Sequence, residues 1–236
     1  KDYGISADNV KADFTAVIKR SRDVAEGMSK GVQFLMKKNK IDVIMGTAKV
    51  KPGKKVDVIG VDGKTSTYLA NHIIIATGAR SRQLPNLPQD GKKIIGYREA
   101  MSLPKQPKSM VVVGSGAIGV EFAYFYATMG TKVTVVEFLP NVVPVEDEDV
   151  SKQLEKSLKK IGIEVMTEAS VESVDTKGDV CKVNIKTKTG NVTLDADIVL
   201  SAVGIEANIT GLGLEETGIK TDKGKIIVDA YQQTSV

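Results

Sequence analysis

Residues 110–123 read "MVVVGSGAIGVEFA", an apolar run that enters three closely spaced glycines. The run is typical of a buried strand, and the pattern after the glycines is typical of a helix. At this spacing the first glycine permits a tight turn, the second lets the backbone approach a pyrophosphate, and the third lets the helix pack closely on the strand. The stretch therefore predicts a dinucleotide-binding loop made of Gly114, Ser115, Gly116, Ala117, Ile118, Gly119 and Val120.

Two acids follow the glycines. Glu137 ends the next predicted strand, 18 residues after Gly119, where a carboxylate can accept hydrogen bonds from ribose hydroxyls. It would repel a 2′-phosphate, and no arginine occurs from 131 to 145 to bind one, which favours NAD over NADP. The alternative is a glycine-rich turn with a solvated glutamate at the strand end. Glu121, near the helix start, is either an ordinary surface acid or a functional residue, and the residues alone leave both interpretations open.

The bulk composition is that of an ordinary globular protein. A length of 236 residues allows one large domain or two small ones. The net charge of +4 is too weak a bias to indicate a nucleic-acid partner. No apolar run approaches a membrane span and no signal peptide opens the chain, so we expect a cytoplasmic protein with no membrane partner. Because the chain starts at Lys1 and stops without a closing element, we expect it to be an excerpt of a longer protein.

The chain has one cysteine and one histidine, and neither indicates a reactive site. Cys181 is the only cysteine, so no disulfide can form within these residues, and its strand-like surroundings favour a structural role. His72, the only histidine, precedes a strand pattern and is also interpreted as structural. We expect neither a metal site nor a catalytic residue in this chain.

The first part of the chain predicts mixed elements. Apolar residues at three-and-four spacing indicate a helix over 8–38. A short strand over 41–46, a hairpin turning at Asp62 and Gly63, and a buried strand over 72–78 are expected next. Residues 80–108 contain four prolines and are interpreted as a loop-like linker.

The second part predicts an alternation of strands and helices. The expected helices cover 117–129 and 147–161, and the second has a buried stripe formed by Val150, Leu154, Leu158 and Ile161. A three-stranded meander and an apolar strand ending at Gly204 follow. This last strand resembles the one ending at Gly78, about 126 residues earlier, as in a weak internal repeat of two nucleotide-binding units. The predicted fold class is α/β: a Rossmann-like NAD-binding domain, with a parallel sheet and an antiparallel meander, and part of a second domain.

The order of several motifs resembles a known family. "HIIIATGARSRQLP", "YREAMSLPKQPKSMVVVGSGAIGVEFA", "VTVVEFLPNVVPVEDEDV" and "SAVGIEANI" together resemble the dihydrolipoamide dehydrogenase family of flavoprotein disulfide reductases. The resemblance covers essentially the whole chain. It implies part of an FAD-binding domain over 1–107, an NAD-binding domain over 108–230, and a return toward the FAD domain over 231–236. It also implies that the redox disulfide, the catalytic His-Glu pair and the dimer-interface domain lie outside this chain.

The resemblance assigns further site residues. It implies FAD contacts near Ala48 and in the "ATGA" segment at Thr77, Gly78 and Ala79. It implies that Glu121 reaches toward the nicotinamide, Val171 lines the adenine end and Gly204 meets the nicotinamide half. The family usually has an arginine after this glycine and a proline two residues further on. Ile205 and Ala207 stand there instead, which puts any contribution of that arginine in doubt.

The implied function is that of an NAD platform and one wall of an FAD site. In the whole enzyme, electrons would pass from dihydrolipoamide through a disulfide and FAD to NAD. The implied partners are NAD(H), lipoyl groups of 2-oxoacid dehydrogenase or glycine cleavage complexes, and a second subunit in a homodimer. We expect the chain alone to be inactive. The alternatives are another disulfide reductase, such as mercuric reductase, and a non-catalytic NAD-binding module.

Overall fold

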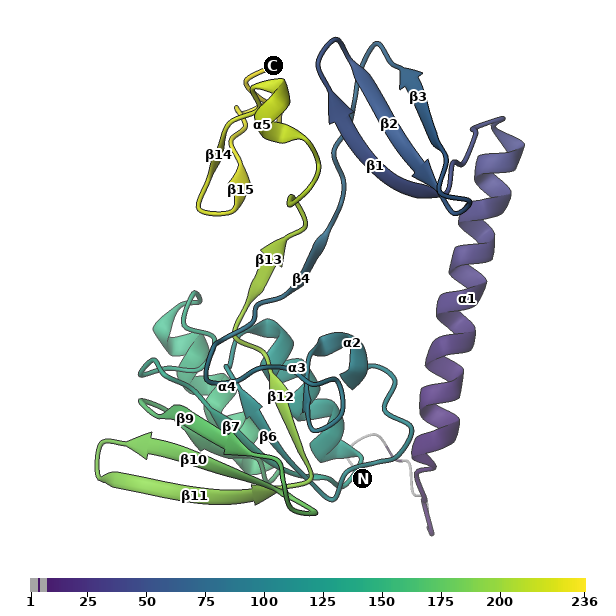
Figure 1. Cartoon of the computed structure of the whole chain (residues 1–236). Helices are drawn as coiled ribbons and strands as arrows, with labels where there is room; N and C mark the ends of the chain where they lie inside the picture. The colour runs from purple at the N-terminus through teal and green to yellow at the C-terminus, as the bar shows by residue number, and fades with distance from the viewer. Residues whose placement is uncertain (1–3, 5–7) are drawn as a thin grey trace. The chain divides into compact units, whose positions relative to one another are not determined.

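The computed structural model describes Gly4 and residues 8–236 (Figure 1). Its contacts divide the chain into two compact units. The first unit combines the chain up to Gly27 with Ser81–Gly204, and the second combines Met28–Arg80 with Ile205–Val236. The domain bounds expected from the sequence, with a change near 107, stay a prediction about the whole protein.

A five-stranded parallel sheet forms the centre of the first unit. Its strand order is β5-β12-β6-β7-β8, so the chain builds outward from β6 in one direction and later returns to the other side of β6. This reversal is the topological switch point of a doubly wound sheet. The strands are β5 (Ile94–Ile95), β12 (Ile198–Ser201), β6 (Ser109–Val113), β7 (Lys132–Val136) and β8 (Glu164–Met166).

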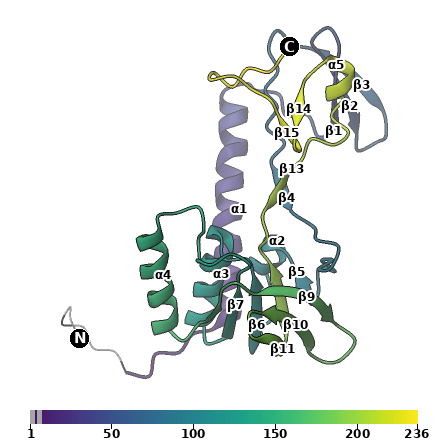
Figure 2. The same cartoon turned by 90° about the vertical axis from the view of Figure 1, so that its left-hand side faces the viewer.

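Two different layers cover the two faces of this sheet, as Figure 2 shows. Alternate residues of β6 point to opposite faces, because side chains alternate along a strand. Met110 and Val112 pack in the core cluster on the helix side, and Val111 and Val113 pack in the cluster on the meander side. The helices are α2 (Tyr97–Ala100), α3 (Ala117–Thr128) and α4 (Glu148–Lys160), and the meander strands are β9 (Ser170–Asp175), β10 (Cys181–Thr187) and β11 (Gly190–Ala196).

The helix α4 begins where its sequence predicts. The Asp147 carboxylate accepts a hydrogen bond from the backbone N–H of Asp149 at 2.9 Å and caps the helix start. Of the expected buried stripe, Leu158 is buried and Leu154 is half-buried, but Val150 and Ile161 are exposed. The prediction of a four-residue stripe is therefore half wrong, because the side of the helix that faces the core contains Ser151, Leu154 and Leu158.

The second unit contains an antiparallel sheet with strand order β1-β2-β3. The hairpin expected at Asp62 and Gly63 is confirmed, since β2 and β3 pair across that turn. A two-stranded ribbon of β4 and β13 and a small hairpin complete the unit together with part of the long helix α1. The bounds are α1 (Phe14–Lys38), β1 (Gly46–Lys51), β2 (Lys55–Gly60), β3 (Thr65–Leu69), β4 (Ala79–Ser81), β13 (Ile205–Ala207), α5 (Leu214–Thr217), β14 (Thr221–Asp222) and β15 (Lys225–Ile226).

Several sequence-based boundaries are wrong. The long helix begins at Phe14 rather than at residue 8, because the Asp13 carboxylate caps it by accepting from the Ala16 N–H at 3.1 Å. The strand expected over 41–46 instead begins at Gly46 and continues to Lys51, where β2 provides its hydrogen-bond partners. The linker expected over 80–108 contains β4, β5 and α2, and β5 is an edge strand of the parallel sheet.

The strand expected over 72–78 is also absent from the described chain. The segment has strand composition, but no described segment forms a ladder with it. Of its three isoleucines, Ile74 is 91% exposed, and Ile73 and Ile75 are half-buried. The overall fold class, a parallel sheet with an antiparallel meander and part of a second domain, is confirmed.

Candidate dinucleotide-binding site

The glycine-rich loop lies between the carboxyl end of β6 and the start of α3. The Gly114 N–H donates to the carbonyl of Val136 at 2.8 Å, which ties the loop to the neighbouring strand β7. Gly114 has φ +96°, a conformation that side chains other than glycine rarely adopt. The loop therefore leaves the sheet at the switch point, where open α/β sheets bind their ligands.

The other two glycines differ in the space around them. A Cβ at Gly119 would collide with the carbonyl oxygen of Gly114, so only glycine lets the helix approach the loop this closely. A Cβ at Gly116 would meet no atom of the described residues within 4 Å. The position at Gly119 is thus closed by packing, whereas the position at Gly116 opens onto free space. A pyrophosphate that approached the backbone at Gly116 would use this space, and the residues present fit such a group.

The N-terminus of α3 provides a partly positive environment that favours an anion. Gly116 is the residue before the first helical turn and has no side chain to cap it. The first N–H groups of a helix have no partner within the helix, and the helix dipole places partial positive charge there. The first turn of α3 contains no acid. The backbone at this point is therefore free to bind phosphate oxygens.

Glu137 lies directly beside the loop, immediately after β7. Its Oε2 accepts two hydrogen bonds from Ser115, one from the backbone N–H and one from the hydroxyl, each at 2.7 Å. Its Oε1 accepts from the backbone N–H of Leu139 at 2.8 Å. Ser115 is fully buried and Glu137 is 7% exposed. The two sequence-predicted residues therefore form one buried hydrogen-bonded unit, a contact that the sequence reasoning did not anticipate.

The loop is fixed from two further sides. The carbonyl of Ser115 accepts from the N–H of Val143 at 3.0 Å, and the Ala202 N–H donates to Val113 at 2.8 Å. Ala202 follows β12, so the ends of β6 and β12 meet at the loop. Gly204, two residues further on, has φ +109° and open space at its Cβ position.

The remaining residues predicted to line the NAD site differ in how deeply they are buried. Val120 is buried against the sheet, Ile118 is half-buried, and Ala117 and Glu121 are exposed on the first turns of α3. Val171 lies on β9 and is buried in the meander core, where its carbonyl accepts from the Asn86 side chain at 2.7 Å. The contact of Glu121 with nicotinamide and that of Val171 with adenine stay predictions.

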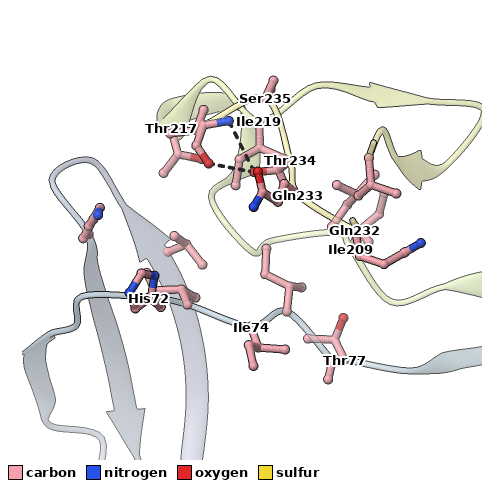
Figure 3. Close-up of a pocket in the computed structure, with 18 of the residues that line it drawn as sticks. His72, Ile74, Thr77, Ile209, Thr217, Ile219, Gln232, Gln233, Thr234 and Ser235 are labelled. Atoms are coloured by element: carbon pink, nitrogen blue, oxygen red, sulfur yellow. Dashed lines mark hydrogen bonds between the residues drawn. The ribbon is translucent and has the colours of Figure 1, made fainter. Parts of the chain in front are cut away.

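The second unit has a cavity of about 1080 Å³ (Figure 3). Two of the four residues predicted to contact FAD, Thr77 and Gly78, line it, whereas Ala48 and Ala79 do not. In Figure 3 the segment with His72, Ile74 and Thr77 faces the C-terminal residues Gln232–Ser235 across the cavity. The sequence did not indicate that the C-terminal residues line this cavity, because they lie more than 150 residues from Thr77 and no local pattern connects them.

Asn208 connects Thr77 to the ribbon strand β13. The Thr77 hydroxyl donates to the Asn208 carbonyl at 2.7 Å, and the Asn208 side-chain amide donates to the Thr77 carbonyl at 3.1 Å. The Asn208 N–H also donates to the carbonyl of Gly78 at 3.0 Å. Thr77 is thus held at one wall of the cavity, and FAD would meet a preformed edge there. The lining is partial for such a large group, because Ala48 and Ala79 are not among the residues that line the cavity.

Two absences concern the described residues, Gly4 and 8–236. Within them, no helix is long and apolar enough to cross a membrane. No group of three or more histidine, cysteine, aspartate or glutamate side chains there is arranged to hold a metal ion.

A family assignment follows from comparison with known proteins. Residues 4–236 match the family described as "Pyridine nucleotide-disulphide oxidoreductase". The chain belongs to this family, whose members are oxidoreductases that use FAD and a pyridine nucleotide. The expected resemblance and the expected cofactor classes are therefore confirmed at the level of the family.

Relatives named dihydrolipoyl dehydrogenase match the chain over its whole length. The protein of Rhizobium etli is 45% identical over 100% of this chain and 52% of its own length, and that of Chlorobaculum tepidum is 43% identical over 99% and 50%. The crystal structure of LpdA from Mycobacterium tuberculosis superposes with a TM-score of 0.88 at 30% identity, covering 99% of this chain and 51% of that chain. The HOCl-induced flavoprotein disulfide reductase RclA of Escherichia coli gives 0.82 at 27% identity, with 95% and 50% covered. The chain spans about half the length of the relatives it matches.

Proposed function

We propose that this chain is the NAD(H)-binding portion of a dihydrolipoyl dehydrogenase. The whole enzyme would oxidise dihydrolipoamide and reduce NAD, with a disulfide and FAD between them. The observation that carries the proposal is the buried Glu137 carboxylate beside the open position at Gly116. One feature suits the ribose hydroxyls of NAD and the other suits its pyrophosphate.

The relatives support the choice of reaction within the family. Proteins named dihydrolipoyl dehydrogenase are 39–45% identical over nearly the whole chain. The partners we propose for the whole enzyme are lipoyl groups of 2-oxoacid dehydrogenase or glycine cleavage complexes, together with a second subunit. When NAD is bound, it supplies the hydride acceptor. The residues of this chain bind its phosphates, orient its ribose and exclude a 2′-phosphate.

Nucleotide titration tests the proposal. We expect the chain to bind NADH about ten- to a hundred-fold more tightly than NADPH, because a carboxylate against a 2′-phosphate costs on the order of 1–3 kcal/mol. Calorimetry with both nucleotides on the 236-residue chain measures this ratio. Equal affinities, or no binding of either nucleotide, would contradict the proposal.

We also propose that these residues alone do not reduce lipoamide. Cys181 is their only cysteine and it is buried, so they cannot form an exposed redox disulfide. The test is NADH oxidation with lipoamide and added FAD, compared with a control without protein. Turnover above that control, or purification of a yellow protein with a flavin absorption band, would be evidence against this part of the proposal.

A further inference from the structure

The Ser115 hydroxyl has a specific relationship to the acid of the nucleotide site. It donates to Glu137 Oε2 at 2.7 Å, and the Ser115 backbone N–H donates to the same oxygen at 2.7 Å. The Leu139 N–H occupies one position on Oε1 at 2.8 Å. A carboxylate has about four acceptor positions. Among the residues that the structure describes, three of these positions are filled, so one position remains, and it is on Oε1.

This distribution determines which part of the carboxylate can contact a ligand. Two donors saturate Oε2 and hold it toward the buried Ser115, whereas Oε1 retains its free position. Charge-assisted hydrogen bonds of this length are stronger than neutral ones, so they fix the carboxylate in one orientation. Glu137 is only 7% exposed, which limits water as a competing donor. A ribose hydroxyl that approaches the glycine loop would therefore meet a preoriented acceptor.

We propose that Ser115 is a positioning residue that sets the preference for NADH over NADPH by acting through Glu137. The inference rests on the proposed function of the site. Its hydroxyl holds the carboxylate at the ribose position. Without it, the carboxylate loses one of the two donors on Oε2 and gains freedom to turn. A turned carboxylate binds ribose hydroxyls less well and repels a 2′-phosphate less strongly, so the preference becomes smaller.

A purely structural role of Ser115 gives a different result. If the hydroxyl only stabilised the loop, its loss would weaken the pyrophosphate contacts that NADH and NADPH share. Both affinities would then fall by the same factor, and their ratio would stay constant. The ratio of the two affinities therefore separates a positioning role from a structural one.

The test is a double-mutant cycle on the 236-residue chain with NADH and NADPH as probes. In the wild-type background we expect Ser115→Ala to weaken NADH binding by about five-fold, the order of one hydrogen bond, and to leave NADPH binding unchanged or stronger. In the Glu137→Ala background the same change should alter NADH affinity less than about two-fold, because the group through which Ser115 acts is gone. Equal factors for the two nucleotides, or an undiminished effect without Glu137, would overturn the proposal.

Controls distinguish a failure of the proposal about Ser115 from a failure of the proposed function. Ser157→Ala removes a hydroxyl that donates to the Gln153 carbonyl at 2.9 Å on the exposed face of α4, and it should leave both affinities unchanged. Ser115→Cys keeps the side-chain shape with a larger γ atom but provides only a weak donor, and it serves if Ser115→Ala does not fold. If both variants unfold, Ser115 is structural and the proposal is wrong. A wild-type chain that binds neither nucleotide refutes the proposed function itself.

Discussion

A Cβ placed on Gly114 would lie 2.6 Å from the carbonyl oxygen of Ala202, so the backbones at the ends of β6 and β12 approach each other closely. The two residues lie 88 positions apart in the sequence. Their contact brings the glycine loop, after one strand, against the segment that follows the strand on the other side of the switch point. The dinucleotide site that we propose at this point would depend on that closeness.

Gly114→Ala should therefore destabilise the first unit. The new methyl group would collide with the Ala202 carbonyl, and the backbone at φ +96° would be strained for alanine. Together these effects should lower the free energy of unfolding by about 1–3 kcal/mol. Urea denaturation followed by circular dichroism measures the change. An unchanged midpoint would mean that the loop relaxes without cost.

Gly116→Val should have the opposite profile. In the part of the chain that the structure describes, nothing lies within 4 Å of the Cβ position, and the backbone conformation of φ −64° and ψ 178° is one that valine adopts readily. The fold should persist, but the side chain would occupy the space through which a pyrophosphate reaches the backbone. We expect NADH binding to become undetectable by calorimetry. Retained affinity in a folded Gly116→Val variant would show that this loop is only a turn.

The glycine loop was predictable because its information is local. The spacing of Gly114, Gly116 and Gly119 after an apolar strand defines the turn, and the structure has β6 and α3 at these positions. The position of Glu137 after the next strand was predictable for the same reason, and the structure has β7 ending at Val136. The Ser115 hydroxyl was a missed signal: a hydroxyl directly after the first glycine lies close to the neighbouring strand end and can reach its acid.

The prediction of a strand over 72–78 was wrong for a physical reason. Its apolar and β-branched residues indicate a strand, but a strand needs neighbours for its backbone hydrogen bonds. The pattern records the preference of the segment and not the presence of a partner. Ile74 accordingly lies 91% exposed beside a cavity. The contact of Thr77 with Asn208 could not be predicted either, because it joins residues 131 positions apart.

Tyr126 should behave as a buried, hydrogen-bonded tyrosine. Its side chain is fully buried, packs against Phe14 and Phe125, and donates to the Ala100 carbonyl at 2.6 Å. Tyr126→Phe leaves that carbonyl without its partner and should lower the free energy of unfolding by about 1–2 kcal/mol. Chemical denaturation tests this, and a stability equal to wild type would show that the hydroxyl contributes nothing.

The same residue gives a prediction at alkaline pH. Burial raises the pKa of Tyr126 from 10.0 to about 12, because the charged phenolate is poorly solvated in the core. The neutral form is therefore favoured by folding. Its contribution to stability should be intact below pH 10 and should be lost as the pH rises toward 12. In absorbance titration at 295 nm, the signal that Tyr126→Phe removes should develop only near pH 12. Its appearance near pH 10 in the folded protein would contradict the burial argument.

Glu216 should give the second unit its sensitivity to acid. Its carboxylate on α5 accepts from the ammonium groups of Lys49 and Lys51 on β1, and these hydrogen bonds lower its pKa from 4.5 to about 2. A lowered pKa means that the stabilisation is present above pH 4.5 and is lost as the pH falls toward 2.

The backbone N–H of Val50, which donates to the Leu212 carbonyl at 2.8 Å, reports on the same contact between β1 and the segment before α5. We expect its hydrogen-exchange protection factor to fall over this pH range in wild type, and to be lower and nearly constant in Glu216→Gln. Glu215→Gln, which removes the same charge from the adjacent exposed position, should follow the wild-type curve, and added salt should weaken the wild-type effect because the pair is exposed. Identical curves for Glu216→Gln and wild type would show that these ion pairs do not hold α5 to β1.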